Sequence, residues 1–282
     1  MNFKTYRTPK EYYPIVKDFL HRNEITNVLT IGLLRNASPD EDYSKCFYCV
    51  GSVEDEIQLA LIIHGLHIIL VTEDDLYLQE AADFVNSSNL DFPGVIGPRP
   101  FVDQFVNHLV VATDMNIELK MSQRIYRLDA VNDVELSSGY MRLATQDDLD
   151  TVMIWNEDFS VCEGMKPNLE HMRNKRIKDI DEKKLFLWID NEVPVTMTSL
   201  SKRTGDGMHV GLVYTPKAFR RKGYATSLVA KVSAHAIETY KYCTLYTDLG
   251  NPTSNSIYMK IGYNPIVDSA MYLVNNEEAV GK

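Results

Sequence analysis

Arg220-Arg221-Lys222-Gly223-Tyr224-Ala225 is the stretch of sequence that decides the fold. It follows an apolar run at residues 210–214 and leads into a run with helical periodicity at residues 227–239. A strand, a cationic turn with a glycine and a helix N-terminus together predict an anion-binding loop, because backbone N–H groups and the positive end of the helix dipole face the same ligand. Gly223 lets the backbone approach that ligand without a Cβ. The spacing Arg-x-x-Gly-x-Ala suits a pyrophosphate, so we expect a nucleotide-type cofactor.

The composition is that of a globular protein, with 282 residues of which 45% are hydrophobic and 24% are charged. This length favours two domains of about 140 residues each. The beginning of the sequence has no apolar leader and no apolar run is long enough to cross a bilayer, so we expect a cytoplasmic protein without a membrane partner. The formal net charge of −10 falls on the N-terminal half. Solubility explains that charge better than attraction of a cationic partner, and no basic patch suggests nucleic acid.

Cys46 and Cys49 have the CxxC spacing found in redox and zinc sites, but no second pair accompanies them. They lie in a strand pattern, in which residues three apart point to opposite faces. Buried strand cysteines are therefore favoured over a metal or redox site. His64 and His67 flank the predicted turn at Gly65 and are interpreted as hairpin residues, so no metal is expected.

The hydrophobic periodicity predicts the same order of elements in both halves: helices, an antiparallel strand set, helix, strand, helix, strand. In the first half we expect helices at 9–22, 24–35, 75–86 and 100–113, and strands at 45–51, 56–63, 66–72, 94–98 and 117–128. In the second half we expect helices at 147–158 (capped by Thr145), 169–180, 227–239 and 254–261, and strands at 140–143, 184–189, 193–202, 209–214, 244–248 and 268–274. Residues 1–130 would form one domain, 131–138 an acidic linker and 139–282 the other domain.

A segment downstream of the anion-binding loop narrows its ligand. Residues 245–263 predict a strand, a polar turn with Asn251, and a helix with Tyr258 that ends in Ile-Gly-Tyr. The loop and this segment, in this order, resemble the acetyl-CoA-binding core of the GNAT superfamily of acyl-CoA-dependent N-acyltransferases. The resemblance covers about residues 139–275. It implies an α+β (mixed α/β) fold with two GNAT-like domains, each with a mostly antiparallel central sheet flanked by helices.

The N-terminal half is similar to a second, degenerate copy of this domain. Its segments at residues 94–98 and 123–128 are similar to N-terminal domains attached to some GNAT enzymes. At the position of the anion-binding loop it has Thr72-Glu73-Asp74-Asp75, and three acids would repel a pyrophosphate. We therefore do not expect this half to bind CoA.

The resemblance implies acetyl-CoA as the co-substrate. Backbone groups of Val213, Tyr214 and Thr215 would pair with the pantetheine arm. The pyrophosphate would be held by the N–H groups of Arg221, Lys222, Gly223, Tyr224, Ala225 and Thr226. Cations at a helix start oppose the dipole unless an anion binds there, which favours a phosphate ligand for Arg221 and Lys222. Asn251 would hydrogen-bond the pantetheine, and Asn255 would orient Asn251 or Tyr258 or cap the helix.

Tyr258 stands where the family places the general acid that protonates the departing CoA thiolate. The alternative is a tyrosine that only packs within its helix. No general base can be named, because residues 210–214 contain no carboxylate and Tyr246 stands where other members carry a Glu. Glu163, Asp248, a water chain and an amine that arrives neutral all remain open.

We therefore expect an acetyl-CoA-dependent N-acetyltransferase that acts on a primary amine of a small molecule or peptide, with activity only in the C-terminal half. The amine would attack the thioester directly while strand N–H groups polarise its carbonyl. Trp155, Asn156, Phe159 and Glu163 would lie near the acceptor, although core packing explains the two aromatic residues equally well. The alternative functions are a non-catalytic acyl-CoA sensor (a pseudoenzyme) and an interaction module. The sequence does not decide whether the protein forms a homo-oligomer.

Overall fold

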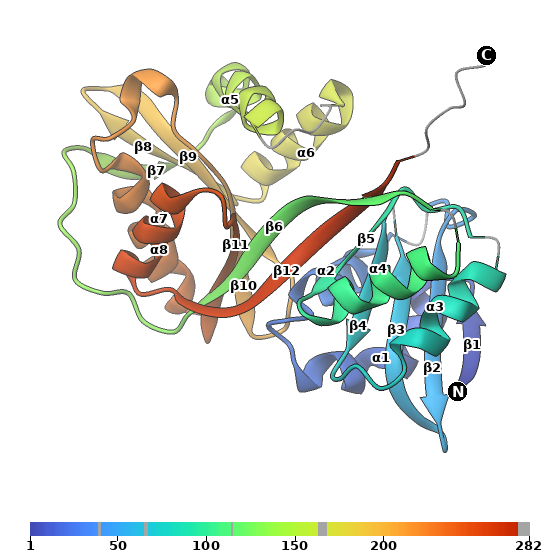
Figure 1. Ribbon diagram of the computed structural model, residues 1–282. Coiled ribbons are helices and arrows are strands. Elements are labelled where there is room, and N and C mark those ends of the chain that lie inside the picture. The colour runs from blue at the N-terminus through green and yellow to red at the C-terminus, as the bar shows by residue number, and fades with distance from the viewer. Residues whose placement is uncertain (39–40, 65–66, 89, 114, 163–167, 276–282) are drawn as a thin grey trace, which may run out of the picture. The chain divides into compact units, whose positions relative to one another are not determined.

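The computed structural model describes residues 1–38, 41–64, 67–88, 90–113, 115–162 and 168–275. The chain forms two compact units. The first unit comprises Met1–Ile125, Thr247–Gly250 and Pro265–Lys282, and the second comprises Tyr126–Tyr246 and Asn251–Asn264. Each unit contains helices and mostly antiparallel strands (Figure 1), which confirms the predicted fold class.

The first unit is built on strands in the order β1-β2-β3-β4-β5-β12-β6. The pair β4–β5 is parallel, whereas β1–β2, β2–β3, β3–β4 and β5–β12 are antiparallel. Its elements are β1 (Asn2–Tyr6), α1 (Pro9–Arg22), α2 (Val28–Asn36), β2 (Phe47–Val53), β3 (Glu56–Ile63), β4 (Ile68–Thr72), α3 (Leu78–Ser87), β5 (Gly94–Pro98), α4 (Phe101–Val111), β6 (Ile117–Leu128) and β12 (Asn264–Val274).

The second unit has strands in the order β11-β10-β9-β8-β7, of which only β10 and β11 pair in parallel among these neighbours. Its helices α7 and α8 pack on one face of the sheet, and α5 and α6 pack on the other. Its elements are β7 (Tyr140–Leu143), α5 (Leu149–Cys162), α6 (Leu169–Asp181), β8 (Leu185–Asp190), β9 (Val193–Lys202), β10 (Gly207–Tyr214), α7 (Tyr224–Ile237), β11 (Tyr242–Asp248) and α8 (Pro252–Ile261).

Local sequence signals set the entry into α5. Thr145 and Asp148 form a reciprocal capping box, and a short 3₁₀ turn at Gln146–Asp148 leads into the helix. The predicted cap at Thr145 is thus confirmed. Arg142 donates two hydrogen bonds to the Asp148 carboxylate, at 2.7 and 2.8 Å, and this pairing lowers the pKa of Asp148. The 3₁₀ turn that leads into α5 is therefore fixed to β7.

The first unit has an apolar cluster on each face of its sheet. One cluster includes residues of α3 and α4, and the other includes residues of α1 and α2. Cys49 is buried in the first of these, and Cys46 packs against the second. The CxxC cysteines therefore point to opposite faces as expected, and the free thiol of Cys49 has its pKa raised to about 12 by burial.

The last strand of the chain belongs to the first unit. β12 pairs with β5 from Ser269↔Pro98 to Leu273↔Gly94, and Ala270 is buried among the side chains of α3 and α4. Arg124 on β6 binds Asp268 on β12 with two hydrogen bonds of 2.5 and 2.9 Å. Conversely, the end of β6 supplies Tyr126 and Leu128 to the core of the second unit. The first unit is thus completed by β12, from the C-terminal half of the sequence, and the second unit by the end of β6, from the N-terminal half. A division into domains at residues 131–138 assigns each of these segments to the other unit.

We expect Ala270→Asp to destabilise the first unit although residue 270 lies near the C-terminal end of the chain. Ala270 is 1% exposed, so the new carboxylate would be buried without a partner, at a cost of about 3 kcal/mol or more. Hydrogen exchange should show lost protection of amides in β3 and β4, with β8 much less affected.

Ile266→Asp is the matched control, because Ile266 lies on the same strand but is 47% exposed. It should change the free energy of unfolding by less than about 0.5 kcal/mol. Equal effects of the two substitutions, or loss of protection in β8 alone, would contradict this assignment of β12.

Candidate functional site

The pairing between β10 and β11 ends while both strands continue. The last paired residues are His209 and Thr244, yet β10 runs on to Tyr214 and β11 to Asp248. Backbone N–H and C=O groups beyond this point therefore lack ladder partners between the two strands, and such groups demand other partners. An opening between two strands with exposed backbone groups can accept an extended ligand as an added strand.

A β-bulge shapes β10 at this opening. Gly211 pairs with Ser199 and Tyr214 pairs with Met197, so that one extra residue is accommodated on β10. Leu212 takes up the bulge with a left-handed backbone at φ 53°. The extra residue reverses the alternation of side chains, because Leu212 and Tyr214 pack with α5 whereas Val213 packs with α7. Nothing in the sequence signals the bulge, since Leu rarely adopts this conformation.

The predicted anion-binding loop has the expected position and an unusual backbone. A 3₁₀ turn at Lys217–Phe219 follows β10, and helix α7 begins at Tyr224 with Gly223 as its N-cap at φ 80°. Arg221 is also left-handed, at φ 63°. No side chain caps α7 and no acid lies in its first turn. The first N–H groups of α7 thus face outward without a protein carboxylate, which is the arrangement that binds anions.

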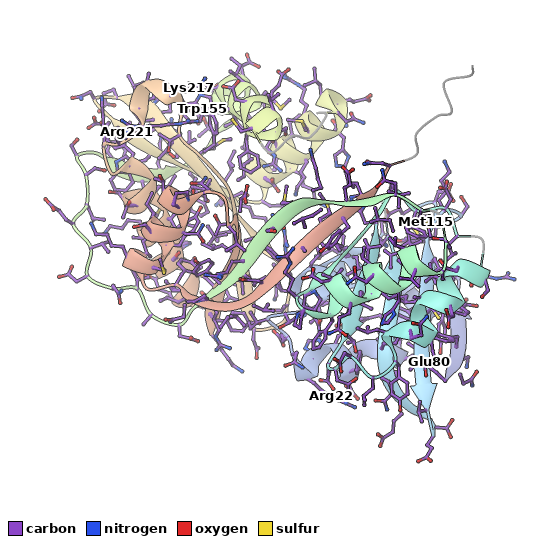
Figure 2. The ribbon with its side chains drawn as sticks, in the orientation of Figure 1. Arg22, Glu80, Met115, Trp155, Lys217 and Arg221 are labelled. Carbon is purple, nitrogen blue, oxygen red and sulfur yellow. The ribbon has the colours of Figure 1, made fainter. Side chains whose placement is uncertain are left out.

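The basic side chains of the loop precede the first helical turn rather than forming part of it. Arg220 donates from Nε to the carbonyl of Thr215 at 2.9 Å and lies over the ring of Tyr214. Arg221 and Lys222 are exposed, and Lys222 lies 6.0 Å from the ring centroid of Phe219. Figure 2 labels two residues of this segment, Lys217 and Arg221. Arg220 therefore anchors the loop to the end of β10, while the other two cations remain at the surface.

The expected pantetheine-binding residues lie at the end of β10. Tyr214 donates from its hydroxyl to Asp158 on α5 at 2.9 Å, and burial followed by this bond raises its pKa to about 12. The hydroxyl of Thr196 donates to the carbonyl of Tyr214 and itself accepts from Thr215, both at 2.8 Å. Because the carbonyls of Tyr214 and Thr215 already accept hydrogen bonds, the groups offered to a ligand centre on Val213.

The other expected pyrophosphate-binding residues form the first turn of α7. Tyr224 and Thr226 are buried, and Tyr224 donates to Asp190 at 2.5 Å, which lowers the pKa of Asp190. The expected linker lies against the same turn, since the N–H of Ser137 donates to the hydroxyl of Ser227 at 2.8 Å. This linker is therefore fixed to the second unit rather than hanging between domains.

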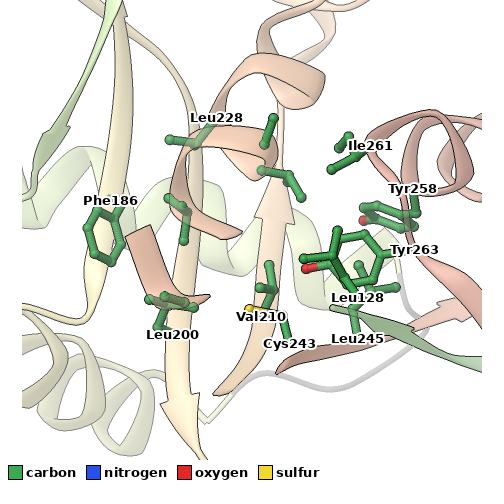
Figure 3. Close-up of a cluster of buried hydrophobic side chains, with 14 of the residues drawn as sticks. Leu128, Phe186, Leu200, Val210, Leu228, Cys243, Leu245, Tyr258, Ile261 and Tyr263 are labelled. Carbon is green, nitrogen blue, oxygen red and sulfur yellow. The ribbon is translucent and has the colours of Figure 1, made fainter. Parts of the chain in front are cut away.

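Asn251, Asn255 and Tyr258 lie on or just before α8. Asn251 caps the helix by accepting from the N–H of Ser254, and Asn255 accepts from the hydroxyl of Tyr126 at 2.8 Å. Asn255 also donates to the carbonyl of Asn251 at 2.8 Å, so it supports the cap. Tyr258 is 7% exposed, and its ring contacts those of Tyr126 and Tyr263. Figure 3 shows Tyr258 beside Tyr263 within the core cluster.

The expected acceptor residues are mostly part of the core. Trp155 is 8% exposed and its ring lies 6.4 Å from that of Tyr214, while Phe159 packs in the same cluster and Asn156 is buried. Glu163, a candidate base, lies outside the described residues. Asp248, the other candidate, accepts a hydrogen bond from the N–H of Gly250 at 2.7 Å.

Sequence reasoning missed His209, which lies at the last paired position of β10. Its Nδ1 lies 3.2 Å from the hydroxyl of Thr244, and its ring contacts that of Tyr246 at 5.4 Å. The signal available in the sequence is a single histidine in the strand that precedes the anion-binding loop, where only carboxylates were considered as bases.

The first unit has the same pair of parallel strands, but their junction is filled. β4 and β5 pair at Ile68↔Val95 and Ile69↔Ile96, and a Cβ at the next residue, Gly97, would lie 3.1 Å from the carbonyl oxygen of Leu70. The turn after β4 is held by hydrogen bonds from the C-terminal end of α1, because Glu73 accepts from Arg22 and Asn23. Residues 68–76, all of them described, include no left-handed backbone.

Among the described residues, no group of three or more His, Cys, Asp or Glu side chains is arranged to hold a metal ion. Within the same ranges, no helix has both the length and the apolar character needed to cross a membrane.

Comparisons with known proteins give a family match in the C-terminal part of the chain and similar structures over nearly its whole length. The profile of the FR47-like protein family matches residues 200–273, which include the loop, Asn251 and Tyr258. A search of curated proteins gives no significant match.

Several solved structures share the fold. A GNAT-family acetyltransferase from Colwellia psychrerythraea has 12% identity and a TM-score of 0.61, with 97% of this chain and 99% of that chain covered. A GCN5-related N-acetyltransferase from Sphaerobacter thermophilus has 12% identity and a TM-score of 0.64, with 96% and 94% covered. A tandem GNAT protein from the clavulanic acid biosynthesis pathway has 12% identity and a TM-score of 0.56, with 96% and 98% covered. The predicted fold is thereby confirmed: the chain has the fold of GNAT-family acetyltransferases over nearly its whole length.

Proposed function

We propose that this protein is an acetyl-CoA-dependent N-acetyltransferase whose second unit binds the cofactor and transfers its acetyl group to a primary amine. The observation that carries the proposal is the opening between β10 and β11, which leads directly to the uncapped N-terminus of α7. A CoA molecule needs both features, because its pantetheine arm is an extended chain with amide groups and its pyrophosphate is an anion.

In this proposal the residues around the opening bind the pantetheine arm and the pyrophosphate. The bulge at Leu212 and Val213 offers backbone groups to the pantetheine arm and to the thioester carbonyl, where N–H groups would stabilise the developing oxyanion. Arg221, Lys222 and the first N–H groups of α7 would hold the pyrophosphate, and Asn251 would lie beside the pantetheine. The first unit has a filled junction and an acidic turn, so in this proposal it binds no CoA.

Tyr258 would act as the general acid. The amine attacks the thioester carbonyl, and the phenol supplies a proton as the C–S bond breaks. Acceptors in this proposal are small molecules or peptides with a primary amine. A metal ion has no part in the proposed reaction.

The direct test measures the release of free CoA thiol from acetyl-CoA across a panel of polyamines, amino acids, aminoglycosides and peptides. Turnover with one of these amines would support the enzyme. Tight binding of acetyl-CoA without turnover on any amine would favour a sensor. A folded protein that does not bind acetyl-CoA would contradict both the cofactor site and the function.

We expect Gly223→Glu to abolish acetyl-CoA binding, because a carboxylate would stand where the pyrophosphate binds. Gly223→Ala is the matched control, since it introduces the same strain at φ 80° without the charge. A Cβ there would lie 3.7 Å from Ser137, so either variant should lose only about 1–2 kcal/mol of stability. Calorimetric titration should show Gly223→Glu binding at least about tenfold more weakly than Gly223→Ala. Equal affinities would mean that the loop does not bind an anion.

We expect Tyr258→Phe to lower the rate of acetyl transfer by about 10²- to 10⁴-fold without weakening acetyl-CoA binding. Tyr263→Phe is the control, because this neighbouring tyrosine is also buried and shares a hydrogen bond of 2.8 Å with Ser233. It should lower thermal stability but leave the rate nearly unchanged. If both variants lose the same fraction of activity, Tyr258 acts through packing and not as the acid.

A further inference from the structure

We propose that His209 is the group that accepts the proton from the attacking amine. The proposal rests on the acetyltransferase function above and supplies the base that carboxylates at the usual positions would provide. Three structural features carry it: the position of His209 at the opening between the strands, the face of the sheet to which it points, and the way its ring is held.

The position of His209 places its ring at the point where β10 and β11 separate. His209 and Thr244 form the last pair, and the bulge at Leu212 begins three residues further along β10. The next residue on the same face of the strand is Gly211, which has no side chain to cover the ring. A Cβ at Gly211 would lie 3.7 Å from Nε2 of His209. Nε2 therefore faces the part of β10 that would hold the thioester.

His209 also lies on the opposite face of the sheet from Tyr258. Met208 and Val210, its neighbours along the strand, pack in the same cluster as Tyr258, and strand side chains alternate between faces. The amine must approach one side of the thioester carbon while sulfur leaves from another. A base and an acid on opposite faces of the opening match that requirement.

The ring of His209 is held in a fixed orientation. Thr244 lies at hydrogen-bond distance from Nδ1, so Nε2 is the nitrogen available to a substrate. Tyr246 packs against the ring at 5.4 Å, and the guanidinium of Arg203 lies 5.7 Å from the ring centroid of Tyr246. Thr244 and Tyr246 are positioning residues in this arrangement, because they fix the ring without contacting the amine.

The surroundings keep His209 neutral and ready to accept a proton. Burial, and secondly the positive charge of Arg203, hold the pKa of His209 well below its usual value. Among the described residues, the ionisable groups beside the ring include Arg203 and Tyr246, while Ser201 lies opposite on β9. The same effects disfavour a lasting imidazolium, so the accepted proton is passed on to solvent.

The proton balance of the step is simple. The amine nitrogen forms the C–N bond, the C–S bond breaks, and one N–H proton moves to Nε2 of His209. The hydroxyl proton of Tyr258 moves to the departing sulfur. Exchange with solvent returns His209 and Tyr258 to their starting states, so one proton has left the nitrogen and one has reached the thiolate.

The test uses the full-length protein, labelled with ¹⁵N-histidine, and the variants His209→Gln and His209→Ala. Addition of acetyl-CoA should shift the imidazole resonances of His209 and leave those of His235, an exposed histidine on α7, unchanged. His209→Gln should bind acetyl-CoA like the wild type but transfer acetyl about 10²- to 10⁴-fold more slowly near pH 7. His235→Gln is the matched control and should keep the wild-type rate.

Two further results separate proton transfer from a structural role. The rate of His209→Gln should rise with pH as the amine loses its own proton, whereas wild-type transfer should depend less steeply on pH. Added imidazole should restore part of the activity of His209→Ala. Unchanged His209 resonances with bound acetyl-CoA, or a His209→Gln rate within about threefold of wild type, would overturn the proposal. A wild-type protein that does not bind acetyl-CoA would instead contradict the proposed function.

Discussion

The end of strand pairing at His209 and Thr244 is the constraint on which the second unit depends. Buried backbone groups need partners, and here the neighbouring strand supplies none. Side chains of β9 supply some of these hydrogen-bond partners. Thr198 and Ser199 donate to the carbonyl of Gly211, and Thr196 donates to the carbonyl of Tyr214. The opening is therefore a consequence of the backbone geometry of β10 and β11.

The chain returns from the second unit to the first just after α8. α8, which carries Tyr258, ends at Ile261, and β12 begins three residues later at Asn264 and enters the first unit at Pro265. Gly262 makes this turn at φ 117°, where a Cβ would lie 2.7 Å from the carbonyl oxygen of Ala130. The pairing of β12 with β5 thus holds the chain just beyond the helix that bears the proposed acid.

Much of this organisation could be predicted from the sequence because it depends on local signals. The strands at 56–63, 94–98, 117–128, 140–143 and 193–202 and the helix at 9–22 begin and end where periodicity places them. The anion-binding loop is also a local signal, since glycine adopts at little cost the left-handed conformation that Gly223 has before α7. Other elements depend on contacts that a sequence pattern does not contain. β1 alternates weakly, with only Phe3 and Tyr6 half-buried, and its formation depends on pairing with β2.

The sequence predicts neither the neighbour of β12 nor the bulge in β10, because both depend on pairing between residues that are far apart in the chain. A strand pattern at 268–274 predicts a strand but not the neighbour with which it pairs, because Ala270 and Tyr272 would suit either sheet. At Leu212 the sequence favours regular β structure, and the pairing of Tyr214 with Met197 overrides that preference.

The bulge links the fold to the chemistry through a change in side-chain direction. In a regular strand Tyr214 would share a face with Met208 and Val210, and with Tyr258. The extra residue turns Tyr214 to the opposite face, where its hydroxyl meets Asp158 and its ring meets Trp155. Residues before the bulge keep their own alternation, so His209 faces the same side as Tyr214. One inserted residue thus holds the end of β10 against α5, on the face of the sheet to which His209 already points.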